Sequence, residues 1–444
     1  MLLNRDNLWS DTGRGQDAVG PGRRAFLGGV ALAALGALPA AWPDPVSAQG
    51  RPAPRSVMLD GTLRLARVAP YLTIAHLPEP PEREPQPIID PERDDDAARY
   101  LRRLAASGRA AGLDSVYYDN RDDGHSELPP TAFPQITRIR YDDVLRAKGL
   151  GYGLAGALLF DRIVIGNSST AYTSGPDARS LPRHAMTHPP EPQRAYASYA
   201  LNHIYVYPEH RDHDEADLFP ANWPYMLISQ GSSYSDRPFL EAIAMTIAAF
   251  RPETLARLER EQLLAPTVQM VFRRAQLRVR SRSAYLSGEA HPAVFDADAI
   301  QPVRMMALAQ SIAPEDIPPM VRLRVEHEAD ELVRDGSAPR GYWFDTPSSI
   351  ARTWYSGDEP RTIILSSSET SDPNQRPLRF EWLVIGTAPE NVRLVPQGPN
   401  GASMRIVFRQ GALSGQRIDI AVIADNGRHL SAPAFFSVTY GGHI

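Results

Sequence analysis

Hydrophobic residues between positions 93 and 355 fall into short runs separated by segments with helical spacing. Runs of four or five mostly apolar residues are typical of buried strands. Such runs occur at residues 115–118, 162–165, 204–207, 225–228 and 268–272. Strands that alternate with helices predict an α/β, or α+β, main domain over residues 93–355.

Two of the predicted helices have clear start signals. The acidic residues 94–96 precede Ala97, Leu101 and Leu104, which share one helical face. Acidic residues favour the first turn of a helix, so we interpret the triplet as a cap rather than a site. A second helix begins near residues 236–238 and continues in apolar residues at helical spacing until Pro252.

From residue 356 to residue 444 the pattern changes to short alternating runs separated by turn signals. Alternation with a period of two places every second side chain on the same face of a strand. Such runs occur at residues 363–365, 378–384, 404–408, 418–423 and 435–440. They predict an all-β, antiparallel sandwich after the main domain.

The first 48 residues carry a segment of a different kind. Arg23 and Arg24 precede Phe26, Leu27 and a mildly apolar run that ends near residue 41, and small residues follow up to Ala48. The segment resembles a twin-arginine (Tat) signal peptide, with Gly22 in place of the usual Ser or Thr. The alternative is a tail that contains an Ala-rich helix.

The resemblance implies export of the folded chain by the twin-arginine translocase to the periplasm or the exterior. The apolar run is shorter than the ~20 residues of a membrane span, and no later run approaches that length, so no stable span is expected after cleavage. Residues 49–92 are rich in Pro and Glu. They predict an extended arm, because Pro blocks helix and ladder hydrogen bonds.

The C-terminal segment carries a second resemblance. Residues 371–374, Ser-Asp-Pro-Asn, precede a strand with Trp382, and residues 418–422 lead into an Asp-Asn-Gly turn. This resembles the polycystic-kidney-disease-type (PKD) immunoglobulin-like module, which implies a β-sandwich with Trp382 in its core. Residues 386–388 depart from the Gly-Asp-Gly turn of many members. Such modules usually serve as spacers or adhesion units.

Charge and composition exclude several function classes. The chain has 47 basic and 52 acidic residues, a formal net charge of −5 and no cysteine. The absence of cysteine excludes disulfides, thiol nucleophiles, Cys-ligated zinc and iron–sulfur clusters. A slightly acidic chain has no global field for nucleic acid, so we expect no nucleic-acid partner.

The first candidate site is the polar segment at residues 117–126, directly after a predicted strand. Loops after strands usually carry the sites of α/β domains. Asp119, Asp122 and His125 are therefore candidate catalytic residues. Arg121 stands at the third ligand position of a calcium loop, so that motif fails. The alternative is an Asx-rich turn held by Arg–Asp pairs.

The second candidate site follows the strand predicted at residues 204–207. His210, Asp212 and His213 are close enough in sequence to be ligands of a divalent metal. In an extended segment His213 would point away from the other two, so a metal would need a tight turn or ligands from elsewhere. The alternative is a solvated polar loop.

Two loops after predicted strands, at residues 166–170 and 229–236, are rich in Gly and Ser. A strand–loop–helix arrangement directs backbone N–H groups at one point, which suits an anion, an oxyanion or an activated Ser. Ser232 is a candidate nucleophile, with His213 or His210 as its base. Neither loop has the Gly-x-Ser-x-Gly motif, and a helix cap with a tight turn is the favoured interpretation.

Two hypotheses follow. The first is an exported hydrolase that acts on a glycan or another envelope polymer, using water activated by a carboxylate or a divalent metal. The second is a non-catalytic envelope protein that binds a polysaccharide or protein partner through its polar loops, with an immunoglobulin-like spacer.

Overall fold

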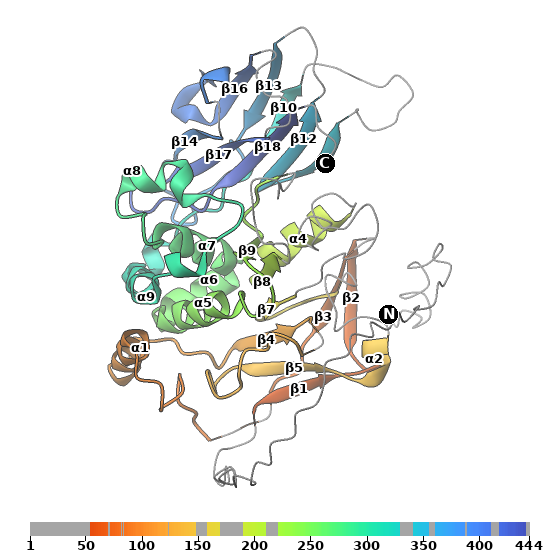
Figure 1. Ribbon diagram of the computed structural model, residues 1–444, viewed down its shortest axis with the longest axis vertical. Coiled ribbons are helices and arrows are strands. Elements are labelled where there is room, and N and C mark those ends of the chain that lie inside the picture. Colours follow the sequence, from red (N-terminus) through yellow and green to blue (C-terminus); the bar gives the residue numbers. More distant parts are fainter. Residues whose placement is uncertain are drawn as a thin grey trace, which may run out of the picture. The chain divides into compact units, whose positions relative to one another are not determined.

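The structure is a computed structural model, and Figure 1 shows its elements. It describes residues 54–69, 72–80, 82, 84–122, 124–147, 158–168, 190–209, 221–328, 341–354, 360–386, 389–409 and 417–440. The Tat-like segment and the candidate metal ligands His210, Asp212 and His213 lie outside the described residues.

A six-stranded parallel sheet forms the centre of the main domain. In spatial order it contains β1 (Ser56–Leu59), β5 (Thr137–Tyr141), β4 (Val116–Asn120), β7 (Ile163–Asn167), β8 (His203–Glu209) and β9 (Met226–Gln230). Four of the five predicted strands are confirmed as β4, β7, β8 and β9. Strands β7 and β8 are buried at every position, which explains their continuous apolar runs.

The segment at residues 49–92 is more than an extended arm. It contains β1 at the edge of the parallel sheet and the antiparallel pair β2 (Arg64–Ala69) and β3 (Leu72–His76), which β6 (Leu158–Phe160) extends. Strand β1 alternates exposed and buried residues and pairs in parallel with β5. The high Pro content of the whole segment hid this alternation, because most of the Pro residues follow β3.

Helices pack against the sheet and one another, with α5 in contact with β7. They are α1 (Asp96–Ala106), α2 (Asp143–Ala147), α4 (Glu191–Ala200), α5 (Arg237–Ala249), α6 (Pro252–Arg260), α7 (Leu264–Arg274), α8 (Arg282–Tyr285) and α9 (Pro302–Ser311). The predicted helices at α1 and α5 are confirmed. Asp95 caps α1 by accepting a hydrogen bond from the Ala98 N–H, as the acidic triplet indicated.

The strand predicted at residues 268–272 is wrong, because these residues lie within α7. Every residue from Leu264 to Arg273 is buried. A helix that is buried on all sides has no polar face, so its apolar run cannot be distinguished from a strand by periodicity.

Two further sheets follow. One is antiparallel and contains, in order, β10 (Arg324–Glu328), β13 (Arg361–Ser366), β16 (Ser403–Phe408) and β15 (Val392–Gln397). The other contains β11 (Tyr342–Thr346), β12 (Ser349–Trp354), β18 (Ala434–Tyr440), β17 (Arg417–Asp425) and β14 (Arg379–Ile385). Its β12–β18 pair is parallel, so the expected all-antiparallel pairing is wrong at this position.

The two sheets share one hydrophobic core, to which Ile406 and Phe408 contribute from the first sheet and Ile420 and Phe436 from the second. Strands β10, β11 and β12, which precede residue 356, belong to these sheets. An immunoglobulin-like or PKD-type topology stays a prediction. No helix in the described ranges is long and apolar enough to cross a membrane.

Trp382 on β14 is partly buried and packs against this shared core. Its indole N–H donates a hydrogen bond to the Gly401 carbonyl at 2.6 Å. We expect Trp382→Ala to lower the free energy of unfolding by about 3 kcal/mol, the lower end of the range for buried aromatic residues. Urea unfolding followed by far-UV circular dichroism measures this change, because that signal comes from the backbone and not from the tryptophan. A change in the free energy of unfolding below ~0.5 kcal/mol would contradict a structural role.

Candidate active site at the carboxyl edge of the parallel sheet

The carboxyl ends of β4 and β7 lie side by side in the parallel sheet. After β4 the chain adds β5 on one side of β4 in the sheet, and then crosses over to add β7 on the other side. The order of the strands therefore reverses between β4 and β7, and ligands of α/β domains bind outside the strand ends at such a reversal. The candidate residues Asp119 and Asp122, together with Asn167, lie at or just after these strand ends.

Asp119 is fully buried and is the centre of a polar network. Its carboxylate accepts hydrogen bonds from Arg121 at 2.6 Å, Tyr141 at 2.8 Å and Tyr205 at 2.6 Å. Burial raises the pKa of both phenols, so they remain protonated donors. Because its oxygens are enclosed by these donors, we assign Asp119 a structural role, in place of the catalytic role that its sequence position indicated.

Arg121 completes this network. The guanidinium is buried, donates to the Leu158 carbonyl at 2.9 Å and lies 5.7 Å from the centre of the Phe160 ring. The alternative interpretation of this segment, an Arg–Asp network, is thus correct for Asp119 and Arg121. Gly166 permits the close packing, because a Cβ there would lie 2.3 Å from the Asp119 carbonyl oxygen.

Asp122 and His125 lie in the loop that follows β4. A carboxylate oxygen of Asp122 lies 3.2 Å from Nδ1 of His125. Asp122 is buried, whereas 47% of the His125 side chain is exposed. The carboxylate therefore orients an imidazole that solvent or a substrate can reach, which is the arrangement that a catalytic histidine needs.

Asn167, at the end of β7, connects this loop to Asp236. The Tyr118 hydroxyl donates to Oδ1 of Asn167 at 2.7 Å, and Nδ2 of Asn167 donates to Oδ2 of Asp236 at 2.9 Å. The Tyr118 hydrogen bond fixes the orientation of the amide, so its N–H₂ group faces the Asp236 carboxyl. Oδ1 of Asp236 has no hydrogen-bond partner of good geometry among the described residues.

Asp236 is fully buried in the turn between β9 and α5. Burial raises the pKa of Asp236 to about 6, and the nearby charge of Asp122 adds to the rise, while the Asn167 hydrogen bond opposes it. The sequence favours a helix cap in this loop, and helix α5 does begin directly after Asp236. The Asp236 side chain, however, makes no capping hydrogen bond. A carboxyl group with a pKa near neutrality is suited to proton transfer.

Two of the non-glycine residues with positive φ angles in the described ranges lie near Asp236. Ser126 and Tyr234 both adopt positive φ angles, of 52° and 70°, which non-glycine residues rarely adopt. The Tyr234 N–H donates to the Ser126 hydroxyl at 2.9 Å, which joins the two strained loops. The ring centres of Tyr234 and His125 lie 5.2 Å apart. Strained residues of this kind cluster at functional sites, so their position supports one here.

Ser232 lies in the exposed turn of the same loop. The bases suggested for it, His213 and His210, lie outside the described residues, so its role as a nucleophile stays a prediction. Within the described ranges, no group of three or more His, Asp or Glu side chains is arranged to hold a metal ion. The metal hypothesis at His210, Asp212 and His213 also stays a prediction.

A cavity of about 210 Å³ lies between β4, β5 and the loop after β4. Tyr118 and Asn120 line it from β4, Glu127 from the loop, and Arg138 and Arg140 from β5. Arg138 and Arg140 both pair with Glu127, at 2.5 and 3.5 Å. The cavity therefore adjoins the residues that hold Asn167 and the His125 loop in place.

The sequence interpretation missed Asn167 and Asp236 as individual site residues, although it singled out both of their loops. One signal was present: Asp236 is the acidic residue immediately before an Arg-Pro helix start, in a loop that follows a strand. Because Asp is a common helix cap, this signal favours capping until the structure shows where the carboxyl group points.

No family model matches the chain, and no curated protein matches it. Solved structures that are similar include a nucleoside hydrolase-related hypothetical protein from Saccharophagus degradans, associated with carbohydrate metabolism, at 11% identity and a TM-score of 0.22. That match covers 74% of this chain and 100% of the other. Another is an endo-fucoidan hydrolase of glycoside hydrolase family 107, at 8% identity, with a TM-score of 0.17 and coverages of 73% and 59%. TM-scores this low do not establish a shared fold.

Proposed function

We propose that the protein is an exported hydrolase that cleaves a glycan or another envelope polymer at the carboxyl edge of the parallel sheet. The observation that carries the proposal is the buried Asp236, whose pKa is raised to about 6 beside a second carboxylate, Asp122. Two carboxyl groups in different environments can divide the roles of acid and base. Glycoside hydrolysis requires such a pair.

In the proposed reaction Asp236 is the general acid. Its proton passes to the leaving oxygen as the bond from that oxygen to the anomeric carbon breaks. Asp122, paired with His125, takes a proton from the water whose oxygen forms the new bond to the same carbon. The proton gained by Asp122 returns to Asp236 through solvent, so both groups are restored.

Tyr234 supports a sugar as the substrate. Among the described residues it is one of the most exposed large hydrophobic residues, with 57% of the residue accessible, and its ring lies beside His125. An exposed aromatic ring offers an apolar face to the C–H groups of a sugar while its hydroxyl remains available for hydrogen bonding.

Tyr234→Ala is expected to raise KM for the polymer about tenfold while kcat changes less than twofold, because the ring binds substrate but takes no part in bond cleavage. Steady-state kinetics measures both constants. Tyr234→Phe is the matched control: it keeps the ring and removes only the hydroxyl, so it should raise KM much less than Tyr234→Ala does. A loss of kcat with unchanged KM would place the Tyr234 ring in the chemical step instead.

Export is a separate part of the proposal and rests on the sequence at Arg23 and Arg24. Replacing both by Lys keeps the charge but removes the paired guanidinium groups, so the precursor should remain in the cytoplasm. Cell fractionation with an antibody to the mature chain measures its distribution. Continued export of the double variant would exclude the twin-arginine pathway.

The activity itself is tested by incubating the mature chain, residues 49–444, with a panel of neutral and acidic polysaccharides and measuring new reducing ends. We expect at least one polymer to be cleaved, with Asp236→Asn inactive on it. The alternative is a non-catalytic protein that binds an envelope polymer. If no polymer is cleaved, that alternative is favoured.

A further inference from the structure

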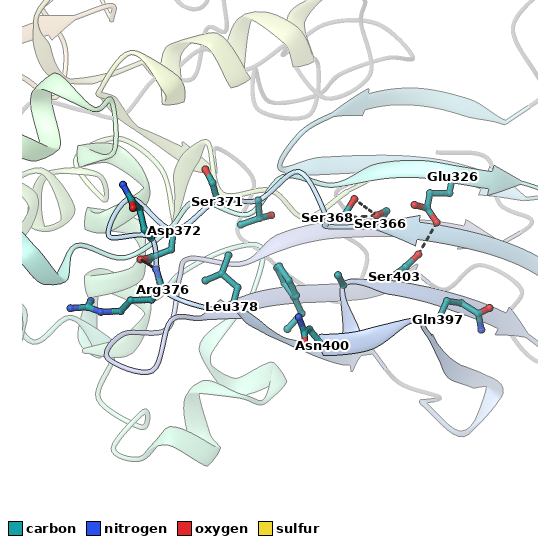
Figure 2. Close-up of a pocket in the computed structure, with 14 residues that line it drawn as sticks. Glu326, Ser366, Ser368, Ser371, Asp372, Arg376, Leu378, Gln397, Asn400 and Ser403 are labelled. Carbon is teal, nitrogen blue, oxygen red and sulfur yellow. Dashed lines mark hydrogen bonds between the residues drawn. The ribbon is translucent and has the colours of Figure 1, made fainter.

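A groove with a volume of about 660 Å³ lies in the C-terminal part of the chain, and none of the residues proposed for hydrolysis lines it. Figure 2 shows its lining residues spread from Asp372 and Arg376 at one end to Glu326 and Ser403 at the other. Strands of both C-terminal sheets contribute, and the turns before β14 and between β15 and β16 complete it. Its volume is in the range of small-molecule sites, ~300–1,000 Å³.

The groove combines an apolar surface with hydroxyl and amide groups. Leu378, Phe380 and Ala402 provide apolar contacts, and most of the surface exposed in the groove is apolar. The polar residues carry hydroxyls or amides, and those with the greatest reach are Gln375, Gln397 and Asn400. A sugar ring has the complementary character, since its C–H groups are apolar and its hydroxyls both donate and accept hydrogen bonds.

The charged residues of the groove already have polar partners. Glu326 accepts hydrogen bonds from Arg324 at 3.0 Å and from the Ser403 hydroxyl at 2.7 Å. Arg376 pairs with Asp316 at 2.5 Å.

Asp372 is likewise occupied within its own turn. It accepts from the backbone N–H groups of Asn374 and Arg376 and from the Asn426 amide. These donors are uncharged, so the Asp372 carboxylate keeps a negative charge that disfavours an anionic ligand. The hydroxyl and amide groups of the groove suit a neutral ligand instead.

Gln375 and Asn400 are exposed and adopt positive φ angles of 59° and 64°. Both line the groove from turns, one on each side of β14 in sequence. Non-glycine residues are uncommon in this backbone conformation, and glycine would adopt it without steric cost. Glycine could therefore replace either residue without straining the backbone.

We propose that this groove binds a segment of a neutral oligosaccharide chain, with Phe380 and Leu378 against the sugar rings and the amides of Gln375 and Asn400 on their hydroxyls. The proposal does not depend on the hydrolase assignment, because none of these residues belongs to the candidate active site. It gives the C-terminal sheets a binding role in place of a spacer role.

The test uses isothermal titration of the mature full chain with hexamers of β-1,4-linked glucose, β-1,4-linked xylose and galacturonic acid. The informative variant is Gln375→Gly combined with Asn400→Gly, because glycine removes both amides and preserves the positive φ angles. Gln262→Gly is the matched control, since Gln262 is an exposed glutamine at φ 59° that does not line the groove.

We expect the wild type and Gln262→Gly to bind at least one neutral hexamer equally well, and the double variant to bind it at least tenfold more weakly, a loss of about 1.4 kcal/mol. Thermal unfolding of the three proteins shows whether they remain folded. The proposal is overturned if neither neutral hexamer binds, if the acidic hexamer binds more tightly, or if the folded double variant retains wild-type affinity.

Discussion

Asp236→Asn should abolish hydrolysis and at the same time stabilise the protein at neutral pH. Removing a general acid costs ~10²–10⁴-fold in rate, because asparagine cannot supply the proton to the leaving oxygen. The side chain keeps its shape and can still accept the Asn167 hydrogen bond, so substrate binding should change little. A loss of kcat with unchanged KM is the kinetic result expected.

The gain in stability follows from the raised pKa of Asp236. Its pKa rises from 3.8 to about 6 through burial, so the folded state favours the protonated form. The stabilisation from this group is complete below pH ~4 and is lost as the pH rises through 6, where ionisation must occur in a buried site. A shift of this size corresponds to ~3 kcal/mol, and a neutral asparagine would avoid that loss.

Urea unfolding of the wild type and Asp236→Asn between pH 4 and pH 8 measures this effect. The two free energies of unfolding should be similar at pH 4 and diverge by ~2–3 kcal/mol in favour of the variant by pH 8. Asp298→Asn, at an exposed aspartate, is the control and should follow the wild type. Parallel curves for the wild type and Asp236→Asn would show that Asp236 is ionised without cost in the folded protein.

Asp119→Asn should lower the free energy of unfolding by ~3–5 kcal/mol, because it leaves the buried Arg121 guanidinium without its negative partner. Asp119 also accepts hydrogen bonds from Tyr141 and Tyr205, and an amide can accept only through its single oxygen. The expected outcome is a protein with a much lower urea midpoint, or one that fails to accumulate.

Tyr141→Phe is the graded control for the same network. It removes one hydrogen bond to Asp119 and should cost about 1 kcal/mol, which a folded protein tolerates. If the network is structural, Tyr141→Phe retains activity in proportion to its folded fraction. An Asp119→Asn variant with wild-type stability and no activity would restore the catalytic role that the sequence position of Asp119 indicated.

Local patterns predicted the elements well where one face is polar or where the strand is short. The β4, β7, β8 and β9 strands and the α1 and α5 helices were recognisable from apolar runs, acidic starts and proline breaks. Helix α7 was not, because complete burial removes the polar face that distinguishes a helix. Strand β1 was missed for a different reason, since its four residues lie in a Pro-rich segment and pair with β5, about 80 positions later.

The place of the candidate site was predictable, but the roles of its residues were not. Asp119 and Asp122 are three positions apart, yet Asp119 lies on β4 within the sheet and Asp122 lies in the loop beyond it. Sequence spacing does not show which of the two carboxylates is enclosed by three buried hydrogen-bond donors. Similarly, an Asp directly before a helix start, such as Asp236, could be either a helix cap or a buried acid. The hydrogen bond from Asn167 to its carboxyl group, which only the structure shows, distinguishes the two.

The most direct test of the proposed mechanism is the pH dependence of kcat/KM on a cleaved polysaccharide, compared between the wild type and Asp236→Asn. A protonated general acid predicts that the wild-type value falls about tenfold per pH unit above pH ~6, as Asp236 loses its proton, and that the variant shows only residual activity without this step. Wild-type activity that stays constant from pH 6 to pH 8, or an Asp236→Asn variant with the wild-type rate, would contradict the account.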